Sequence, residues 1–415
     1  MRVLTPAQVD GWGGVNVDGG EHGRSLKRRT AGGTSARYDW LVVGAGFTGA
    51  TVAERLAREL DQTVLVIDRR DHPGGNAHDR RDEGGRLIHP YGPHIFHTNS
   101  RRIFDHLGRF TDWRPYFHRV RGHVDGRLVP VPFNLDSLGL LFPAGMAERL
   151  SERLIQTFGF GARPSIATLM QDAADGDLRF LGDYVFDKVF AHYTRKQWGL
   201  EPEALDPSVT GRVPVAISRD DRYFTDRYQA MPADGYAALF QRMLDHPNIH
   251  LSLNTEMADV APGRFGRMVY CGALDDYFGR SEGDLPYRSL RFEHRAVAVE
   301  DGLPVGTVNY PNEFDFTRIT DFRHLTGERA GTTALLTEYP IAHAPGVNEP
   351  FYPIPTEASR VLADRYRAMA RALEGQVWFA GRLADYRYYN MDQAVGRGLS
   401  LVEKVLAPAI LKAAT

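Results

Sequence analysis

The chain contains 415 residues, of which 43% are hydrophobic and 25% are charged, as in an ordinary globular protein. Its 50 basic and 52 acidic residues give a formal net charge of -2, which argues against a dedicated nucleic-acid-binding protein. The single cysteine, Cys271, excludes an intrachain disulfide and favours a reducing compartment, so we expect a cytoplasmic protein. No apolar run approaches the roughly 20 residues of a membrane-spanning helix.

The first 37 residues differ in composition from the rest of the chain. They contain eight glycines, scattered charges and no apolar periodicity. Such a segment cannot bury enough apolar surface to offset the entropy lost on ordering. We therefore expect a disordered extension over residues 1–37, a folded body over residues 38–407 and a short tail over residues 408–415.

The first ordered element is predicted to be a strand that leads into a glycine-rich turn. Asp39–Val43 is rich in strand formers, and the run Gly44-Ala45-Gly46-Phe47-Thr48-Gly49 follows it directly. Apolar residues then recur at helical spacing over residues 50–60. A second short apolar strand, Val64–Ile67, ends at the acidic residue Asp68.

This succession of strand, G-x-G-x-x-G turn, helix, strand and acid predicts a Rossmann-like dinucleotide site. Gly44 permits the tight turn, Gly46 lets a pyrophosphate approach the backbone, and Gly49 lets helix and strand pack closely. The helix N-terminus faces the phosphates, and Asp68 can hold ribose hydroxyls. The alternative is a glycine turn that holds no ligand.

Two further features favour FAD over NAD as the dinucleotide. The pair Gly74-Gly75 suits a loop that passes close beneath a cofactor. Far along the chain, Val377–Arg382 is predicted to be a strand and a turn, followed by a helix that starts near Asn390. The positive end of that helix would stabilise negative charge on a reduced flavin. An ordinary C-terminal α/β unit remains the alternative for this segment.

Three histidines, His89, His94 and His97, fall within nine residues. They suggest a metal site only if a third ligand or a carboxylate stands at a recognised spacing, and none does. We therefore expect no metal.

Several stretches, taken in order, resemble the bacterial UDP-galactopyranose mutases, a family of flavoenzymes. The resemblance extends from about Tyr38 to Ala407. The matching stretches are Gly44–Gly49, Gly74–Asn76, Tyr91–Thr98, Val129–Asn134, Tyr193–Gly199, Arg212–Pro214, Asp221–Phe224, Tyr287–Leu290, Tyr352–Pro355 and Gly381–Asp392.

The resemblance implies an α/β fold in three parts. The first is a discontinuous, Rossmann-like FAD-binding domain over about 38–110, 230–275 and 375–407. The second is a helical substrate domain with a mobile loop over about 135–220. The third is a six-stranded antiparallel sheet over about 115–134, 221–230 and 285–355. Residue patterns agree where they are clear, since they predict helices over 145–195 and 235–246 and strands over 288–340.

The resemblance also implies two sets of site residues. The cofactor set is Gly44, Gly46, Phe47, Gly49, Asp68, Arg69, Gly75, Asn76, His94, Ile95, Arg382, Tyr388, Asn390 and Met391. The substrate set is Phe190, Tyr193, Trp198, Arg212, Tyr223, Arg288, Tyr352, Tyr388 and Asn390. Within them, the implied catalytic set is Arg212, Arg288, Tyr352, Tyr388 and His94.

Arg212 and Arg288 match the diphosphate-clamping arginines of the family, and guanidinium forks suit phosphate oxygens. We interpret His94 as a residue of the flavin pocket and not as a proton carrier. The chain departs from the common pattern at Asn390, where many members have aspartate, at Phe351, where tyrosine is common, and at Val189, where some have an aromatic residue.

The implied reaction is the interconversion of UDP-galactopyranose and UDP-galactofuranose without net redox change, a step of galactofuranose biosynthesis. Its implied nucleophile is N5 of reduced FAD (FADH-), which attacks the anomeric carbon of the sugar. The resemblance further implies a homodimer. The alternatives are a mutase acting on another nucleoside diphosphate sugar, an FAD-dependent oxidoreductase of the amine oxidase type, and a non-catalytic flavoprotein that binds sugar nucleotides.

Overall fold

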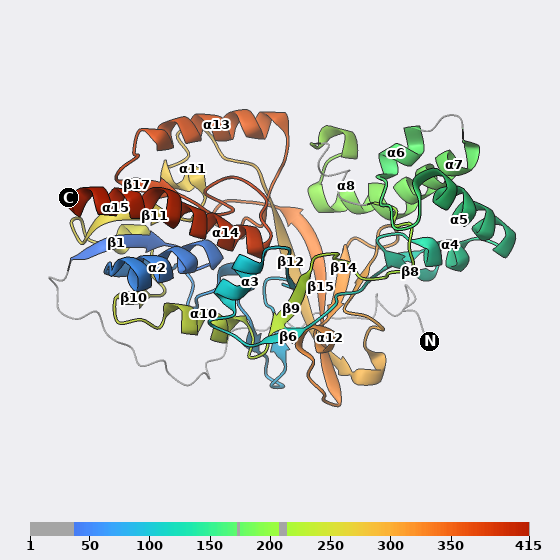
Figure 1. Ribbon diagram of the computed structural model, residues 1–415, viewed down its shortest axis with the longest axis horizontal. Coiled ribbons are helices and arrows are strands. Elements are labelled where there is room, and N and C mark those ends of the chain that lie inside the picture. The colour runs from blue at the N-terminus through green and yellow to red at the C-terminus, as the bar shows by residue number, and fades with distance from the viewer. Residues whose placement is uncertain (1–36, 172–174, 207–213, 415) are drawn as a thin grey trace.

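The computed structural model describes residues 37–171, 175–206 and 214–414. The predicted N-terminal extension, apart from Arg37, lies outside the described residues, and so does Arg212. The described chain forms three parts that follow one another along the long axis of the molecule (Figure 1). An α/β part lies at one end, a sheet crosses the middle, and a group of helices forms the other end.

The α/β part is built on a five-stranded parallel sheet in the order β10-β2-β1-β11-β17. Its strands are β1 (Tyr38–Val43), β2 (Val64–Ile67), β10 (Ile249–Ser252), β11 (Phe265–Tyr270) and β17 (Val377–Phe379). Near-continuous apolar runs such as β2 suit a parallel sheet that is covered on both faces. The predicted α/β class and the three strands read from the sequence in this part are confirmed.

Helices cover both faces of this sheet. On one face, α2 (Phe47–Leu60) packs against α14 (Met391–Leu401) and α10 (Tyr236–Leu244). Above the sheet in Figure 1 lie α11 (Leu274–Tyr277) and α13 (Glu357–Arg371). After α14 the chain makes one π-helical turn and continues into α15 (Ala407–Ala414), so the predicted C-terminal tail is helical as far as Ala414.

The middle sheet has the strand order β16-β12-β15-β14-β13-β7-β8. The strands are β7 (Val120–Val124), β8 (Arg127–Val131), β12 (Tyr287–Ala298), β13 (Thr307–Asn309), β14 (Arg318–Asp321), β15 (Thr332–Ala342) and β16 (Tyr352–Pro353). The predicted antiparallel sheet is confirmed, but within the described chain it has seven strands where six were expected, and one of its pairs is parallel. β13 pairs antiparallel with β14 on one side and parallel with β7 on the other.

A second correction concerns residues 221–230, which form no strand of the middle sheet. Their last residues belong to β9 (Tyr228–Pro232), which pairs with β5 (Phe96–Thr98) and β6 (Trp113–Pro115) in a separate sheet. The shorter elements nearby are the hairpin of β3 (Arg80–Arg81) and β4 (Leu87–Ile88) and the helices α3 (Arg101–Leu107) and α12 (Phe322–Thr326).

The helical part has its own apolar core and agrees with the helices predicted over residues 145–195. It opens with a capping box, in which the Asn134 side chain accepts from the backbone N–H of Ser137 and the Ser137 hydroxyl accepts from the backbone N–H of Asn134. Its helices are α4 (Leu135–Leu141), α5 (Ala144–Phe158), α6 (Ile166–Gln171), α7 (Gly176–Val185), a π-helical turn (Phe186–Ala191) and α8 (His192–Trp198).

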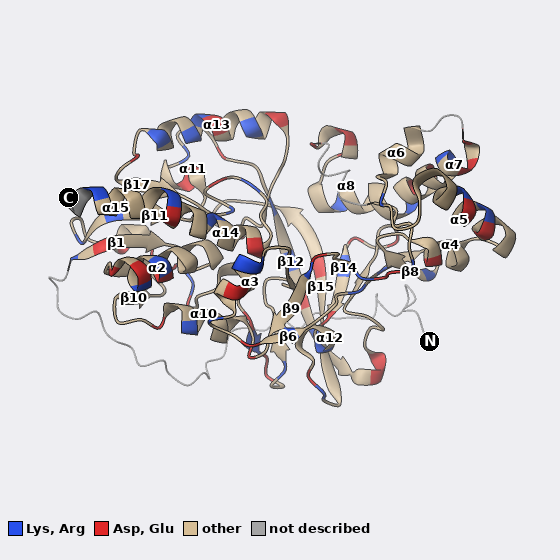
Figure 2. Cartoon of the chain, viewed as in Figure 1, with Lys and Arg blue, Asp and Glu red and all other residues tan. Residues whose placement is uncertain are grey.

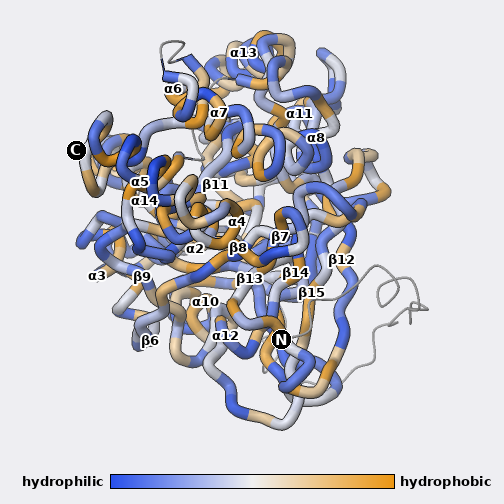
Figure 3. Tube along the Cα trace, turned by 90° about the vertical axis from the view of Figure 1, so that its right-hand side faces the viewer, coloured by the Kyte–Doolittle hydropathy of each residue, from blue (hydrophilic) through white to orange (hydrophobic). Residues whose placement is uncertain are grey.

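Charged residues of both signs occur in every part of the described molecule. Basic and acidic residues are interspersed in all three parts (Figure 2), in line with the small net charge. Hydrophilic and hydrophobic residues alternate along the trace in the rotated view (Figure 3). The largest buried cluster joins the parallel sheet to its helices. None of the helices in the described residues combines the length and the apolar character needed to cross a membrane.

Candidate active site

A cavity of about 2190 Å³ is lined by residues of all three parts of the molecule. Sites for one small molecule usually measure about 300–1,000 Å³. The cavity can therefore hold a dinucleotide and a second ligand together. The α/β part forms one end of it, which we call the cofactor end. The middle sheet and α8 form the other, which we call the substrate end.

The glycine turn at the cofactor end has the geometry that the sequence predicts. Gly44 has φ +104°, and a Cβ there would lie 3.2 Å from the Cβ of Cys271. A Cβ on Gly49 would lie 1.9 Å from the carbonyl oxygen of Gly44, which forbids any side chain. A Cβ added to Gly46 would have only the Cα of Gly75 within 4 Å, at 3.9 Å. The backbones of these two glycines therefore face each other across open space.

The start of α2 completes an anion-binding cradle. No side chain accepts a hydrogen bond at its N-cap, Gly46, so the first N–H groups of the helix are open to a ligand. Asp68 braces the turn, because its Oδ2 accepts from the backbone of Ala45 at 2.8 Å and its Oδ1 from that of Arg70 at 3.0 Å. The residues present thus fit the pyrophosphate and ribose of a dinucleotide.

A second layer beside this cradle was missed at the sequence level. Arg70 donates to Oδ1 of Asn76 at 3.0 Å and to Glu349 at 3.1 Å, and its guanidinium lies 4.2 Å from the centre of the Tyr91 ring. Glu349 comes from the loop after β15, so this contact ties the α/β part to the middle sheet. Sequence motifs carry no sign of a pairing across some 280 residues.

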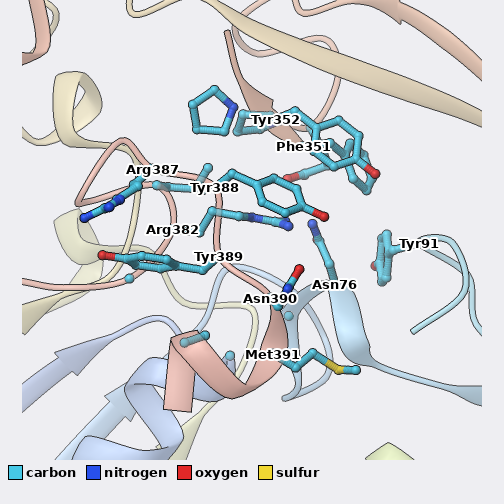
Figure 4. Close-up of a pocket in the computed structure, with 18 of the residues that line it drawn as sticks. Asn76, Tyr91, Phe351, Tyr352, Arg382, Arg387, Tyr388, Tyr389, Asn390 and Met391 are labelled. Carbon is cyan, nitrogen blue, oxygen red and sulfur yellow. The ribbon is translucent and has the colours of Figure 1, made fainter. Parts of the chain in front are cut away.

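The start of α14 also lines the cofactor end, as predicted. Asn390 is the N-cap of this helix, and its backbone N–H donates to Oε1 of Gln393 at 2.9 Å. Figure 4 shows Asn390 and Met391 at the helix start, on the same side of the cavity as Asn76. The helix therefore directs its positive end into the cavity between the two predicted cofactor segments.

The histidines near the cofactor end are engaged with protein partners. His94 Nδ1 lies 2.8 Å from the carbonyl oxygen of Gly92, and His89 Nδ1 accepts from the backbone of His94 at 3.0 Å. Burial lowers the pKa of His94 to about 4 and that of His89 to about 3, so both are neutral at pH 7. His97 lies 2.9 Å from Asp226. No group of three or more potential ligands that could hold a metal occurs among the described residues.

At the substrate end, aromatic rings from distant segments meet. Tyr352 stacks with Tyr388 at a centroid distance of 5.9 Å and meets the edge of Trp198 at 6.2 Å. Figure 4 shows the Tyr388 and Tyr352 rings above Arg382 and facing Asn76. Burial raises the pKa of Tyr352 to about 12 and that of Tyr193 above its usual value, so both phenols stay protonated and can donate hydrogen bonds at neutral pH.

The centre of the substrate end is an ion pair that sequence reasoning missed. Arg318, on β14, lines the cavity and donates to both carboxylate oxygens of Glu338, at 2.7 and 2.8 Å. The Glu338 side chain is 1% exposed and that of Arg318 28%. Burial opposes the charge on Arg318, but Glu338 outweighs burial and raises the pKa of Arg318 above its usual value. A permanent, oriented guanidinium therefore faces the cavity.

Arg318 could be anticipated only from strand register. Its segment is predicted to be a strand, and Glu338 lies directly opposite it on β15. A motif search finds neither residue, because the pair exists only once β14 and β15 are aligned.

The two arginines that the resemblance names are placed differently. Arg212 lies outside the described residues. Arg288, on β12, is not among the residues that line the cavity in the described chain. Its Nε donates to the carbonyl oxygen of Gln197 at 3.0 Å and its Nη2 to that of Lys196 at 3.2 Å, both at the end of α8.

The structure brings most of the predicted site together. Every residue of the implied cofactor set lines the cavity. From the implied substrate set, the lining residues are Phe190, Tyr193, Trp198, Tyr223, Tyr352, Tyr388 and Asn390. Other lining residues that were not predicted include Arg70, Tyr91, Arg163, Asn309, Arg318 and Glu349.

Comparisons with solved structures support this architecture. A crystal structure of reduced UDP-galactopyranose mutase matches with a TM-score of 0.68 and 19% identity, over 89% of this chain and 96% of that one. Wild-type putrescine oxidase bound to putrescine matches with a TM-score of 0.52 and 14% identity, over 89% and 99%. At these identities the two matches show a shared fold and nothing finer.

Sequence comparisons are more specific. Residues 42–110 match the NAD(P)-binding Rossmann-like domain, and residues 188–388 match the UDP-galactopyranose mutase family. A probable UDP-galactopyranose mutase from Klebsiella pneumoniae is 33% identical over 88% of this chain and 94% of its own length. A UDP-galactopyranose mutase from Mycoplasma pneumoniae is 33% identical over 89% and 96%, and a dTDP-fucopyranose mutase from Escherichia coli is 30% identical over 88% and 97%. With identity at this level over nearly the full length of its relatives, the chain belongs to the UDP-galactopyranose mutase family.

Proposed function

We propose that this protein is an FAD-dependent isomerase that interconverts UDP-galactopyranose and UDP-galactofuranose. The observation that carries the proposal is the continuous cavity, with a dinucleotide cradle at one end and the Arg318–Glu338 pair among tyrosines at the other. A nucleotide sugar carries a diphosphate, and an oriented guanidinium is the side chain best suited to it.

FAD is the dinucleotide that suits the cofactor end. The facing glycines Gly46 and Gly75 would accommodate its pyrophosphate, and the start of α14 at Asn390 would lie near the far end of an extended cofactor. Bound in its reduced form, FAD would supply at N5 the electron pair that attacks the anomeric carbon, with no net oxidation of the sugar. No side-chain nucleophile is then needed.

The residues of this chain bind and orient the substrate. We assign the diphosphate to Arg318, whose direction is fixed by Glu338. The hydroxyls of Tyr352 and Tyr388 would donate to phosphate or sugar oxygens, and Phe190 and Tyr193 would flank the nucleobase. The phosphate roles that the resemblance gives Arg212 and Arg288 are kept as proposals.

A second candidate is a mutase of another nucleoside diphosphate hexose, which the 30% identity to a dTDP-fucopyranose mutase favours. That relative is nearly as similar to the chain as the mutases named for UDP-galactopyranose. The cavity itself does not separate the two substrates, because the Arg318–Glu338 pair would serve either diphosphate.

The experiment that tests the function uses the FAD-loaded enzyme, reduced with dithionite, and three substrates in parallel: UDP-galactose, dTDP-fucose and UDP-glucose. Furanose product from UDP-galactose without consumption of reductant is expected, and nearly no turnover by the oxidised enzyme. Preference for dTDP-fucose would select the second candidate. Oxygen uptake or substrate oxidation in step with turnover would show an oxidoreductase instead.

Two further proposals rest on the resemblance and the composition. We propose a homodimer, which sedimentation equilibrium of the FAD-loaded protein would test. We also propose a cytoplasmic location, supported by the single cysteine in 415 residues.

A further inference from the structure

Helix α8 is held in place by two cationic side chains whose hydrogen bonds, within the described residues, go to main-chain oxygens. The first is Lys196, on the helix itself. Its Nζ donates to the carbonyl oxygens of Tyr310 at 2.5 Å, Phe314 at 2.8 Å and Phe316 at 3.0 Å. An ammonium group has three N–H donors, so all three are used by the turn between β13 and β14.

The second cation is Arg288, on β12. Its two hydrogen bonds go to the carbonyl oxygens of Lys196 and Gln197, in the last turn of α8. These oxygens carry the negative end of the helix dipole and have no partner further along the helix. The helix ends at Gly199 in the left-handed region with φ +67°, where an added Cβ would lie 2.9 Å from Nη1 of Arg288.

The two cations join two walls of the substrate end. One wall is α8, which presents Tyr193 and Trp198 to the cavity. The other is the middle sheet, where the turn held by Lys196 connects Asn309 at the end of β13 to Arg318 at the start of β14. The position of Lys196 therefore fixes the distance between the aromatic wall and the guanidinium that faces the ligand.

We propose that Lys196 is a positioning residue that sets the width of the nucleotide-binding end of the cavity. The proposal rests on the proposed function for the identity of the ligand. Lys196 has no donor left for a phosphate, and it does not line the cavity among the described residues. It acts through α8, and its loss affects the binding of a nucleotide more than the chemical step.

Burial and charge are consistent with a fixed cation. Burial lowers the pKa of Lys196 to about 8, against the opposing effect of Glu313 and Asp315 in the same turn. The amine is therefore still protonated at pH 7.

The test compares Lys196→Met with the matched variant Lys188→Met, both as FAD-loaded enzymes. Lys188 lies one helical segment earlier, and its ammonium is paired only with exposed aspartates, Asp125 and Asp187. Isothermal titration of the oxidised enzymes with UDP gives the Kd, and steady-state assays of the reduced enzymes give KM and kcat. We expect Lys196→Met to raise Kd and KM about tenfold, with kcat within about threefold. A tenfold rise corresponds to the loss of one charge-assisted hydrogen bond between Arg318 and the nucleotide. Lys188→Met should change neither.

A second measurement separates positioning from general destabilisation. In a double-mutant cycle, the effect of Lys196→Met on the UDP Kd should shrink to under about twofold when Arg318 is replaced by alanine, because the two residues act on one contact. Additive effects would overturn the proposal. So would a lower melting temperature and FAD content with unchanged KM.

A third measurement does not depend on the ligand. Hydrogen exchange of the amides of α8 should be faster in Lys196→Met than in the wild type, with α2 unchanged. If the wild-type enzyme fails to bind UDP, the proposed function fails, while faster exchange confined to α8 still supports the anchor. Unchanged exchange in α8 would overturn the anchor whatever the enzyme binds.

Discussion

The two ends of the cavity are built in different ways. The cofactor end is made of backbone: facing glycines, the open N–H groups of α2 and the start of α14. The substrate end is made of side chains from α8, β14, β15 and the segments around Tyr352 and Tyr388. A backbone site is specified by short contiguous motifs, whereas a side-chain site depends on how distant strands are aligned. The first tolerates almost no change in its glycines, and the second depends on oriented charge.

The largest expected effect is at Gly49. Its Cβ would overlap the carbonyl oxygen of Gly44 at 1.9 Å, so Gly49→Ala must displace either the turn or α2. We expect no FAD-containing protein from this variant, measured by flavin absorbance after purification. Gly139→Ala is the control, because an added Cβ there meets nothing within 4 Å. Flavin bound normally in Gly49→Ala would show that the cofactor end is less rigid than described.

The next effect is at Arg318 and tests the substrate end. Arg318→Lys keeps the positive charge but removes the planar guanidinium that can donate two hydrogen bonds at once. We therefore expect kcat/KM to fall about 100-fold, which corresponds to the loss of one or two charge-assisted hydrogen bonds. FAD content should not change. Arg291→Lys, on β12 and half exposed in its pair with Glu293, is the matched control. Equal activity of Arg318→Lys would mean that a point charge suffices there.

A smaller effect is expected at Arg288, for which the structure and the family resemblance indicate different contacts. Because its hydrogen bonds go to the end of α8, Arg288→Ala should raise KM about tenfold and leave kcat within about fivefold. Steady-state assays of the reduced enzyme measure this. A fall in kcat beyond 100-fold with unchanged KM would instead show that Arg288 reaches the phosphates in the working enzyme, as the resemblance implies.

The smallest effect concerns the stability of the fold around α3. His106, on α3, is 4% exposed, and neither ring nitrogen has a hydrogen-bond partner among the described residues. Burial lowers its pKa to about 3. Below pH 6.5 this histidine is protonated in the unfolded chain but stays neutral in the folded protein. The free energy of unfolding therefore decreases as the pH falls from 6.5 toward 3.

His106→Leu removes this loss and keeps the site apolar. The melting temperature of the variant relative to the wild type should therefore rise by roughly 2–4 °C between pH 7.5 and pH 5. His250→Leu is the control, since His250 lies partly exposed on β10. A constant difference across this pH range would show that His106 titrates normally in the folded protein.

The contrast between the two ends also explains what the sequence alone could predict. The turn at Gly44–Gly49, the strand that ends at Asp68 and the helix that begins after Asn390 follow from local patterns, and the structure has all three. The middle sheet was less accessible, because the parallel pairing of β13 with β7 joins segments almost 190 residues apart. For the same reason Arg318 and Glu338 were missed, although their strand segments were expected.

The anchor of α8 has a consequence for how related chains can vary. All the acceptors of Lys196 in the β13–β14 turn are main-chain oxygens, which every amino acid supplies. Substitutions in that turn therefore leave the anchor intact as long as the chain follows the same path, whereas inserting or deleting one residue moves the oxygens away from the ammonium. Among homologues that keep this lysine, we expect the amino-acid sequence of the loop to vary freely and its length to be conserved.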